Sequence, residues 1–229
     1  MKPLGRKNYG SIPHLSNSKL GSGDYFINHG QERILTEKKR DRHDEIFVFE
    51  KYDGSNVGIA KVNGKIVALT RSGYEASTSP YKQHHLFAKW VEFQSNRFVD
   101  FLMEGERVCG EWLVQAHGLK YEIKGNPITF FDYFNNNNER MPFDFLHGTG
   151  LPIPRLLHRG DSVSVKELLP ILNEKTQWLK SEELPEGMVY RVEKKGKVDF
   201  LAKWVRSDFE PGKYMIDKED NELVWNIEI

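Results

Sequence analysis

Apolar residues recur at strand spacing in three parts of the chain. Between residues 45 and 72, "EIFVF" is followed by "VGIAKV" and "KIVALT", and the last two runs flank Asn63-Gly64. An Asn-Gly pair between two such runs is the strongest short-range signal for a β-hairpin. The second group is "RVCGEWLV" and "PITFFDYF", and the third is "GMVYRVE" and "DFLAKWV". This mixed order with hairpins predicts an α+β domain built on antiparallel sheets.

Two helices are predicted between these groups of strands. Residues 80 to 104 carry apolar side chains at helical spacings of three and four, namely Leu86, Phe87, Trp90, Val91, Phe98, Phe101 and Leu102. Residues 164 to 180 suggest another helix, which Pro170 is expected to kink or divide. The stretch "NNNNER" is typical of a polar loop. No internal repeat or clear linker interrupts the chain, so we expect a single domain over residues 1 to 229.

The composition is that of an ordinary globular protein, with 38% hydrophobic and 12% aromatic residues. The chain contains no run of about 18 apolar residues, so no membrane helix is predicted. The start "MKPLGRKNYGS" has no apolar region typical of a signal peptide. Cys109 is the single cysteine, which excludes an intrachain disulfide and a cysteine zinc cluster. These features favour a reducing compartment, so we expect a cytoplasmic protein, or one in the host cytoplasm if it is viral.

The formal net charge is zero, from 33 basic and 33 acidic residues, which argues against a protein that simply coats nucleic acid. The charge is unevenly distributed. Residues 217 to 229 contain one lysine and five acids, net −4, so residues 1 to 216 carry +4. A mildly basic body with an acidic end is compatible with local binding of a phosphate backbone.

Several common motifs are absent. The chain contains no G-x-x-x-x-G-K-[ST] phosphate-binding loop and no H-E-x-x-H metal motif, and "LGSGDYF" lacks the third glycine of a dinucleotide-binding turn. The histidines do not fall at metal-ligand spacing. His84 and His85 are expected in a surface or half-buried position on the first helix, whereas His117, which follows a strand, is of slightly more functional interest.

The stretch "EKYDGSN", residues 50 to 56, places Lys51 between a predicted strand and an Asp-Gly turn. Taken alone, this pattern is typical of a lysine before a turn, with Asp53-Gly54 serving only the backbone. Five further motifs follow in order: "TRSG" (70–73), "GEWL" (110–113), "FFDYF" (130–134), "EGMVYR" (186–191) and "LAKWVR" (201–206). Most of them place a charge at or beside the end of a strand. Because unpaired buried charges are costly, the set predicts a shared site for a polyanion.

This ordered set resembles the covalent nucleotidyltransferase superfamily, which comprises polynucleotide ligases and messenger-RNA capping enzymes. Within it, the chain looks most like the ATP-dependent RNA ligases of the double-strand nick-sealing type. The resemblance spans about Glu50 to Phe209, and a weaker likeness begins at "SIPHLS", residues 11 to 16. It implies a ligase adenylation domain in which antiparallel sheets are flanked by helices, with ATP in a groove between the sheets.

The resemblance also implies a three-step reaction. A lysine attacks the α-phosphate of ATP, AMP passes to an RNA 5′-phosphate, and a 3′-hydroxyl displaces the AMP. Lys51 matches the nucleophile, and Lys203 matches the strand lysine that contacts the α-phosphate. An ordinary lysine has a pKa of about 10.4, so a nearby cation or desolvation must lower the pKa of the nucleophile. Mg²⁺ or Mn²⁺ would add positive charge, with Glu186 matching the acid that places metal-bound water.

The remaining roles implied by the resemblance are contacts to the adenosine. Glu50 matches the residue that reads the adenine edge, and Glu111 matches the carboxylate that binds the ribose hydroxyls. Asn56 and Arg71 match contacts to phosphate or ribose. Phe131 matches the aromatic residue that stacks on adenine, a contact worth about 1–3 kcal/mol. A place in the core of the sheet is the other interpretation of Phe131.

The chain departs from the nick-sealing pattern in two places. Those ligases often carry two lysines spaced K-x-K. Here Val205, two residues after Lys203, occupies the position of the second lysine. Arg206 is a possible substitute phosphate contact, although arginine differs from lysine in geometry. Only 20 residues follow Phe209. We therefore expect a minimal monomeric enzyme with a short acidic extension over about residues 210 to 229 and no separate C-terminal domain.

The leading hypothesis is an ATP-dependent RNA ligase of RNA repair that joins 5′-phosphate and 3′-hydroxyl RNA ends through lysyl-AMP. Two other covalent nucleotidyl transfers stay open, a DNA nick ligase and an RNA-capping guanylyltransferase. A nucleotide- or RNA-binding protein without catalysis is the alternative of a different class.

Overall fold

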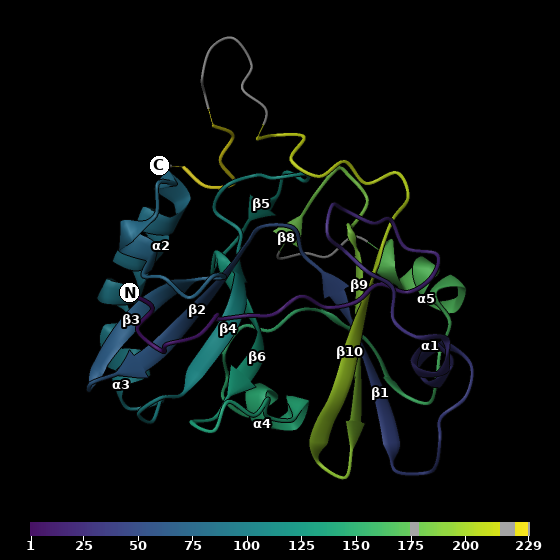
Figure 1. Ribbon diagram of the computed structural model, residues 1–229. Helices are drawn as coiled ribbons and strands as arrows, with labels where there is room; N and C mark the ends of the chain where they lie inside the picture. The colour runs from purple at the N-terminus through teal and green to yellow at the C-terminus, as the bar shows by residue number, and fades with distance from the viewer. Residues whose placement is uncertain (175–178, 216–222, 229) are drawn as a thin grey trace. The chain divides into compact units, whose positions relative to one another are not determined.

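The computed structural model describes residues 1–174, 179–215 and 223–228 of the chain, and these form two compact units (Figure 1). The first unit comprises Met1–Gly10, Gly54–Gln115 and Asn126–Ile153. The second comprises the described residues of Ser11–Asp53, Ala116–Gly125 and Pro154–Ile229. The chain therefore passes from the second unit into the first directly after Asp53, within the turn that follows Lys51.

The first unit is built on a four-stranded antiparallel sheet in the order β3–β2–β4–β6. Its strands are β2 (Ser55–Val62), β3 (Lys65–Thr70), β4 (Arg107–Trp112) and β6 (Ile128–Phe134). The predicted hairpin at Asn63-Gly64 is confirmed. Both residues have positive φ, 53° and 73° respectively, as a two-residue turn between twisted strands requires.

Two helices, α2 (Lys82–Phe93) and α3 (Ser95–Val99), cover one face of this sheet, and η1 (Ala76–Thr78) and α4 (Phe143–His147) complete the unit. The prediction of one helix over residues 80 to 104 was wrong, because the chain leaves helical geometry at Gln94. The next two residues, Ser95 and Asn96, have side chains that compete for backbone hydrogen bonds. Phe87 of α2 packs 5.3 Å from Trp112, and Phe98 of α3 packs 6.2 Å from Phe130, centroid to centroid.

The second unit contains the antiparallel sheet β10–β9–β1–β7. Its strands are β1 (Asp44–Lys51), β7 (Leu156–Gly160), β9 (Gly187–Lys194) and β10 (Lys197–Val205). A small separate pair joins β5 (Glu122–Ile123) to β8 (Leu179–Lys180). The strands predicted around "EIFVF", "GMVYRVE" and "DFLAKWV" are confirmed as β1, β9 and β10, so the α+β prediction with antiparallel sheets is correct.

Helices α1 (His29–Thr36) and α5 (Val165–Leu172) pack on one face of this second sheet. A capping box between Ser164 and Glu167 starts α5. The prediction of a helix over 164 to 180 was too long, because α5 ends at Leu172. Residues 175–178 of that range lie outside the described residues. Pro170 lies inside α5 and does not divide it, although a proline provides no backbone N–H donor to the helix.

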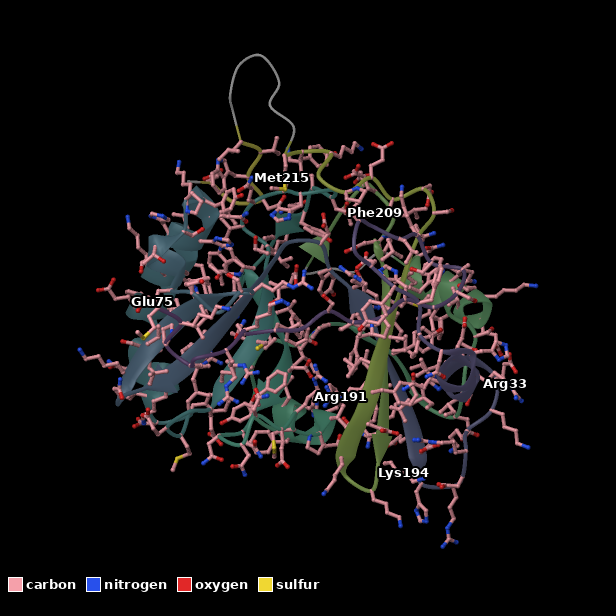
Figure 2. The ribbon with its side chains drawn as sticks, viewed as in Figure 1. Arg33, Glu75, Arg191, Lys194, Phe209 and Met215 are labelled. Carbon is pink, nitrogen blue, oxygen red and sulfur yellow. The ribbon has the colours of Figure 1, made fainter. Side chains whose placement is uncertain are left out.

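Strand alternation decides which side chains of the second unit form its core. Ile46 and Val48 of β1 join a buried apolar cluster with residues of α1, α5, β9 and β10. Lys51 is an odd number of residues from Ile46 and Val48 along β1, so its side chain lies on the opposite face of the sheet. On that face of β9, buried Arg191 forms an ion pair with Glu193 at 2.6 Å, and Figure 2 shows Arg191 on its strand. The sheet therefore has an apolar side and a side that carries charges.

None of the helices in the described parts of the chain has the length and apolar character needed to cross a membrane. Of the predicted acidic extension, residues 216–222 and 229 lie outside the described residues.

We predict that Gly187→Ala destabilises the protein by about 2 kcal/mol or more, because overpacking at a close contact forces the backbone to move. A Cβ atom at Gly187 would lie 1.9 Å from the backbone oxygen of Trp204. The control is Gly30→Ala in α1, where a Cβ would meet only Asn28 Oδ1, at 3.5 Å. Alanine is the better helix former, so this control should be neutral or stabilise by up to about 1 kcal/mol. Chemical denaturation measures both, and equal stabilities of the two variants would contradict the close packing.

Candidate active site

Lys51 is the last residue of β1, and its ammonium group contacts the carboxylate of Glu186. In the strand register Lys51 lies opposite Gly187 of β9, which brings the preceding residue, Glu186, to the same end of the sheet. Lys51 Nζ is 2.5 Å from Glu186 Oε2, and the two side chains are 23% and 8% exposed. Two residues that are 135 positions apart in the sequence are thus joined by one strand pairing.

The environment of Glu186 changes its protonation. Burial raises the pKa of Glu186 to about 7, while the positive charge of Lys51 acts in the opposite direction. A carboxyl group with this pKa exists in both protonation states near neutral pH. It therefore suits a group that accepts a proton during a reaction better than an exposed glutamate does.

The turn behind Lys51 is held by hydrogen bonds from a distant loop. The carboxylate of Asp53 accepts hydrogen bonds from the backbone N–H groups of Gly118, at 2.5 Å, and Leu119, at 2.9 Å. The backbone N–H of Asp53 donates to the Tyr121 hydroxyl at 3.0 Å. The N–H of Tyr121 in turn donates to the side chain of Asn226 at 2.9 Å. These contacts fix the position of the residues that follow the lysine.

Lys203 is the second lysine of this charged region. It lies on β10 opposite Val189, and its Nζ atom is 3.3 Å from Asp24 Oδ1. Burial lowers the pKa of Lys203, and the charge of Lys51 lowers it further. Lys51 thus contacts Glu186, and its charge acts on Lys203, so three residues that the sequence assigns to one site lie near one another in the second unit.

Glu50 precedes the nucleophile candidate but lies on the other face of β1, because neighbouring residues of a strand alternate. Its side chain is buried, and burial raises its pKa to about 7. Arg155 Nη1 is 3.8 Å from Glu50 Oε2, and this oxygen has no hydrogen-bond partner among the described residues. A buried acceptor without a partner is a candidate ligand contact.

Arg206 follows the end of β10. Its Nε atom donates to the backbone oxygen of Pro185 at 2.9 Å, and its guanidinium also hydrogen-bonds Asn173. Its own backbone N–H donates to the backbone oxygen of Glu186 at 3.0 Å. Arg206 thus braces the segment that carries Glu186, and its contact with a phosphate stays a prediction.

Four predicted contact residues belong to the first unit: Asn56, Arg71, Glu111 and Phe131. Asn56 and Glu111 are direct cross-strand partners on β2 and β4. Phe131 is skipped in the β4–β6 register, since Cys109 pairs with Asp132 and Gly110 pairs with Phe130. Such a bulge changes the direction of a side chain. Phe131 is half-buried with its ring 5.1 Å from Tyr9, and Arg71 is exposed just after β3.

Asn56 Oδ1 is a second buried acceptor without a hydrogen-bond partner among the described residues. Glu50 in the second unit and Asn56 in the first unit thus each have one such atom. The roles of these residues remain predictions, but the structure gives both Glu50 and Asn56 a polar atom that a ligand can satisfy.

The donor set near Lys51 fits a divalent ion that is held largely by substrate. In the described ranges, no group of three or more His, Cys, Asp or Glu residues forms an all-protein metal cage. Mg²⁺ is usually bound through one or two carboxylates together with phosphates and water. Glu186 is a carboxylate beside Lys51 and supplies this kind of ligand.

The sequence analysis missed His14, Asp24 and Tyr121. "SIPHLS" contains His14, and "LGSGDYF", which was tested only as a dinucleotide turn, contains Asp24. No local pattern marks Tyr121, because its hydroxyl accepts a hydrogen bond from Asp53, which is 68 positions away. His117, which attracted interest from sequence, lies in the same loop, where burial lowers its pKa.

We predict that Glu50→Gln changes the pH dependence of stability. The carboxyl pKa is higher in the folded protein than in the unfolded chain, so this group lowers wild-type stability as the pH rises through about 4.5 to 7. At about 1.4 kcal/mol for each pKa unit, the variant should gain about 2 kcal/mol relative to wild type between about pH 5 and pH 8. Urea denaturation at both pH values measures this difference, and parallel pH curves would contradict the raised pKa.

Solved structures of similar fold include ligases for RNA and DNA. An archaeal ATP-dependent RNA ligase matches with a TM-score of 0.54 and 20% identity over 87% of this chain and 48% of its own. A putative ATP-dependent DNA ligase from Aquifex aeolicus matches with a TM-score of 0.55 and 20% identity over 87% of this chain and 50% of its own. A Naegleria gruberi RNA ligase with PPi matches with a TM-score of 0.53 and 14% identity over 85% of this chain and 61% of its own. The present chain spans about half the length of the first two proteins, and the likeness concerns the fold.

No curated protein matches the chain at a significant level. A model of the RNA ligase family matches residues 44–205, which is well over half of the 229 residues and includes β1, β9 and β10 with Lys51, Glu186 and Lys203. The chain therefore belongs to the RNA ligase family.

Proposed function

We propose that the protein is an ATP-dependent RNA ligase that joins 5′-phosphate and 3′-hydroxyl ends through a lysyl-AMP intermediate. The observation that carries the proposal is the contact between Lys51 Nζ and Glu186 Oε2 at 2.5 Å, at the end of a strand inside the family-matched region. A surface lysine beside a turn would not require a buried carboxylate. Lys203, whose pKa responds to Lys51, adds a second cation to the same region.

The first step forms a nitrogen–phosphorus bond between Lys51 Nζ and the α-phosphorus of ATP, and pyrophosphate leaves. The amine must lose its proton before it attacks. Glu186 touches Nζ and has a pKa of about 7, so it accepts this proton. Lys203 stabilises the negative charge on the α-phosphate. A divalent ion, when bound, neutralises the pyrophosphate and favours its departure.

The two later steps start from the lysyl-AMP phosphoramidate that the first step forms. The 5′-phosphate oxygen of RNA attacks the adenylyl phosphorus, the nitrogen–phosphorus bond breaks, and Glu186 returns its proton to the nitrogen, so that Lys51 leaves as the amine. The 3′-hydroxyl of the second RNA end then attacks the activated 5′-phosphate, forms the phosphodiester and releases AMP. The hydrogen bonds from Gly118 and Leu119 to Asp53 keep the Lys51 turn in place, which supplies the positioning that such reactions demand.

The nucleotide contacts follow from the same residues. Glu50 Oε2 lacks a hydrogen-bond partner among the described residues, and we assign it to the edge of adenine. Asn56 and Glu111, paired across β2 and β4, are assigned to phosphate and ribose hydroxyls. Phe131 is assigned to stacking on adenine, and Arg71 to a phosphate. The assignments of Glu50 and Asn56 are supported by a buried oxygen of each that has no hydrogen-bond partner among the described residues, and the other assignments rest on the resemblance of their motifs.

A DNA nick ligase is the second candidate. It is favoured by the likeness of the fold to a putative ATP-dependent DNA ligase from Aquifex aeolicus, which is as similar as the archaeal RNA ligase in both TM-score and identity. The two candidates share the lysyl-AMP step and differ in the strand that accepts AMP, so the nucleic-acid substrate separates them.

We predict that incubation with α-labelled ATP and magnesium transfers label to the protein, and that Lys51→Ala abolishes the transfer. The matched control is Lys194→Ala, since Lys194 lies at the end of β9 in the same unit and pairs with Asp41 at 2.6 Å (Figure 2). This control should label like wild type. Label that survives Lys51→Ala would show that another residue is the nucleophile. Label taken only from GTP would replace the ligase proposal with a capping guanylyltransferase.

We predict that nicked duplex RNA is sealed at least about tenfold faster than single-stranded RNA, because a complementary strand holds the two ends together. The measurement is a panel of 5′-phosphorylated RNA and DNA, each as single strands and as nicked duplexes, with ATP and magnesium. Faster sealing of nicked DNA than of nicked RNA would favour the DNA ligase. Equal rates for single strands and nicks would contradict the nick-sealing assignment.

A further inference from the structure

The backbone on both sides of Lys203 is fixed by an N-terminal segment that lies along the free edge of β10. The Lys203 N–H donates to the backbone oxygen of Pro13 at 2.9 Å, and the Leu15 N–H donates to the backbone oxygen of Lys203 at 2.9 Å. Two residues later, the Val205 N–H donates to the Ser18 hydroxyl at 2.8 Å. Residues 13 to 18 therefore act as a further partner for the strand that carries Lys203.

The same segment then folds back and brings Asp24 to the ammonium of Lys203. His14 exchanges backbone hydrogen bonds with Tyr25 and Ile27, both at 2.8 Å, so residues 25–27 lie beside residue 14. Asp24, just before this return, places Oδ1 3.3 Å from Lys203 Nζ. The pair is part-buried, with side chains 17% exposed for Lys203 and 25% for Asp24.

His14 lies beside the carboxylate of Asp24. Its Nε2 atom is 3.0 Å from Asp24 Oδ2, and its Nδ1 atom is 2.7 Å from the Ser18 hydroxyl oxygen. That oxygen already accepts the N–H of Val205, so its own proton is available to His14 Nδ1. This arrangement leaves the ring proton on Nε2, which lies near Asp24 Oδ2 without the alignment of a hydrogen bond. His14 is 1% exposed, and burial lowers its pKa, which keeps the ring neutral.

The charges in this part of the second unit then form two lysine–carboxylate pairs, Lys51 with Glu186 and Lys203 with Asp24. Two buried cations would repel each other and lose hydration without these partners. Val205 is uncharged, so it adds no third cation that would need a carboxylate of its own. The network consequently fits a site that works with one strand lysine.

We propose that Asp24 is a positioning residue for Lys203, and that the His14 ring, held by the Ser18 hydroxyl, packs beside the Asp24 carboxylate. Asp24 holds the ammonium in its charged form and in one direction, with its other two N–H groups available for a phosphate. The proposal rests on the proposed function, since it assigns Asp24 a role in forming lysyl-AMP. Asp24 acts through Lys203 and does not itself touch the reacting atoms.

The test measures the rate of lysyl-AMP formation by the full chain in a double-mutant cycle. Asp24→Asn keeps the size of the side chain and removes its charge, and Asp24→Glu keeps the charge. We expect Asp24→Asn to lower the rate at saturating ATP by about tenfold to a hundredfold, as misplacement of a phosphate-binding group does. Asp24→Glu should recover a large part of this loss. Asp41→Asn is the matched control, because Asp41 pairs with Lys194 in the same unit, and it should leave the rate unchanged.

The combination with Lys203→Ala separates positioning from a general structural effect. If Asp24 acts through Lys203, Asp24→Asn combined with Lys203→Ala is no slower than Lys203→Ala alone. Additive losses, or an Asp24→Asn rate equal to wild type, would overturn the proposal while leaving the ligase function intact. Thermal melting confirms that each variant is folded, and Asp24→Ala replaces Asp24→Asn if the latter does not fold. Failure of the wild-type protein to form an adduct would instead reject the proposed function and this inference with it.

Discussion

The contact between the Lys51 ammonium and the Glu186 carboxylate is the interaction on which the candidate site depends. Burying either charge alone is costly, and removing one partner of such a pair leaves the other uncompensated. The pairing of β1 with β9 brings the two residues together, and Asp53 ties the following turn to the loop at Gly118 and Leu119. Sheet register and loop hydrogen bonds thus deliver one nitrogen and one carboxylate oxygen to a separation of 2.5 Å.

The same constraint explains why carboxylates accompany both lysines. Lys203 lies close enough for Lys51 to lower its pKa, and Asp24 balances the charge of Lys203. A site that must receive a polyphosphate needs positive charge, but two cations without partners would repel each other before the ligand arrives. Pairing each lysine with its own acid offsets part of the cost of holding two cations close together when no ligand is bound.

Local patterns were sufficient to predict most strands of the fold. The Asn63-Gly64 pair placed a hairpin correctly because positive φ at both positions is a local property of the backbone. The apolar runs of β1, β9 and β10 were recognised for the same reason. Helix ends were predicted less well. The spacing of apolar residues continues past the break at Gln94 and past the end of α5 at Leu172, so spacing alone predicted helices that were too long.

The site was predictable only in part. Lys51, Glu186 and Lys203 are recognisable because their motifs resemble those of a known superfamily, and the family match covers all three. Asp24 and Tyr121 were missed because their partners, Lys203 and Asp53, lie 179 and 68 positions away. No local spacing reports such a contact.

The most direct measurement for the central claim is intact-mass analysis after incubation with ATP and magnesium, followed by peptide mapping of the modified residue. A single adenylyl group attached to Lys51 through an acid-labile bond is the predicted result. An adenylyl group on a different side chain, or no covalent adduct under conditions in which ATP binds, would contradict the role of Lys51.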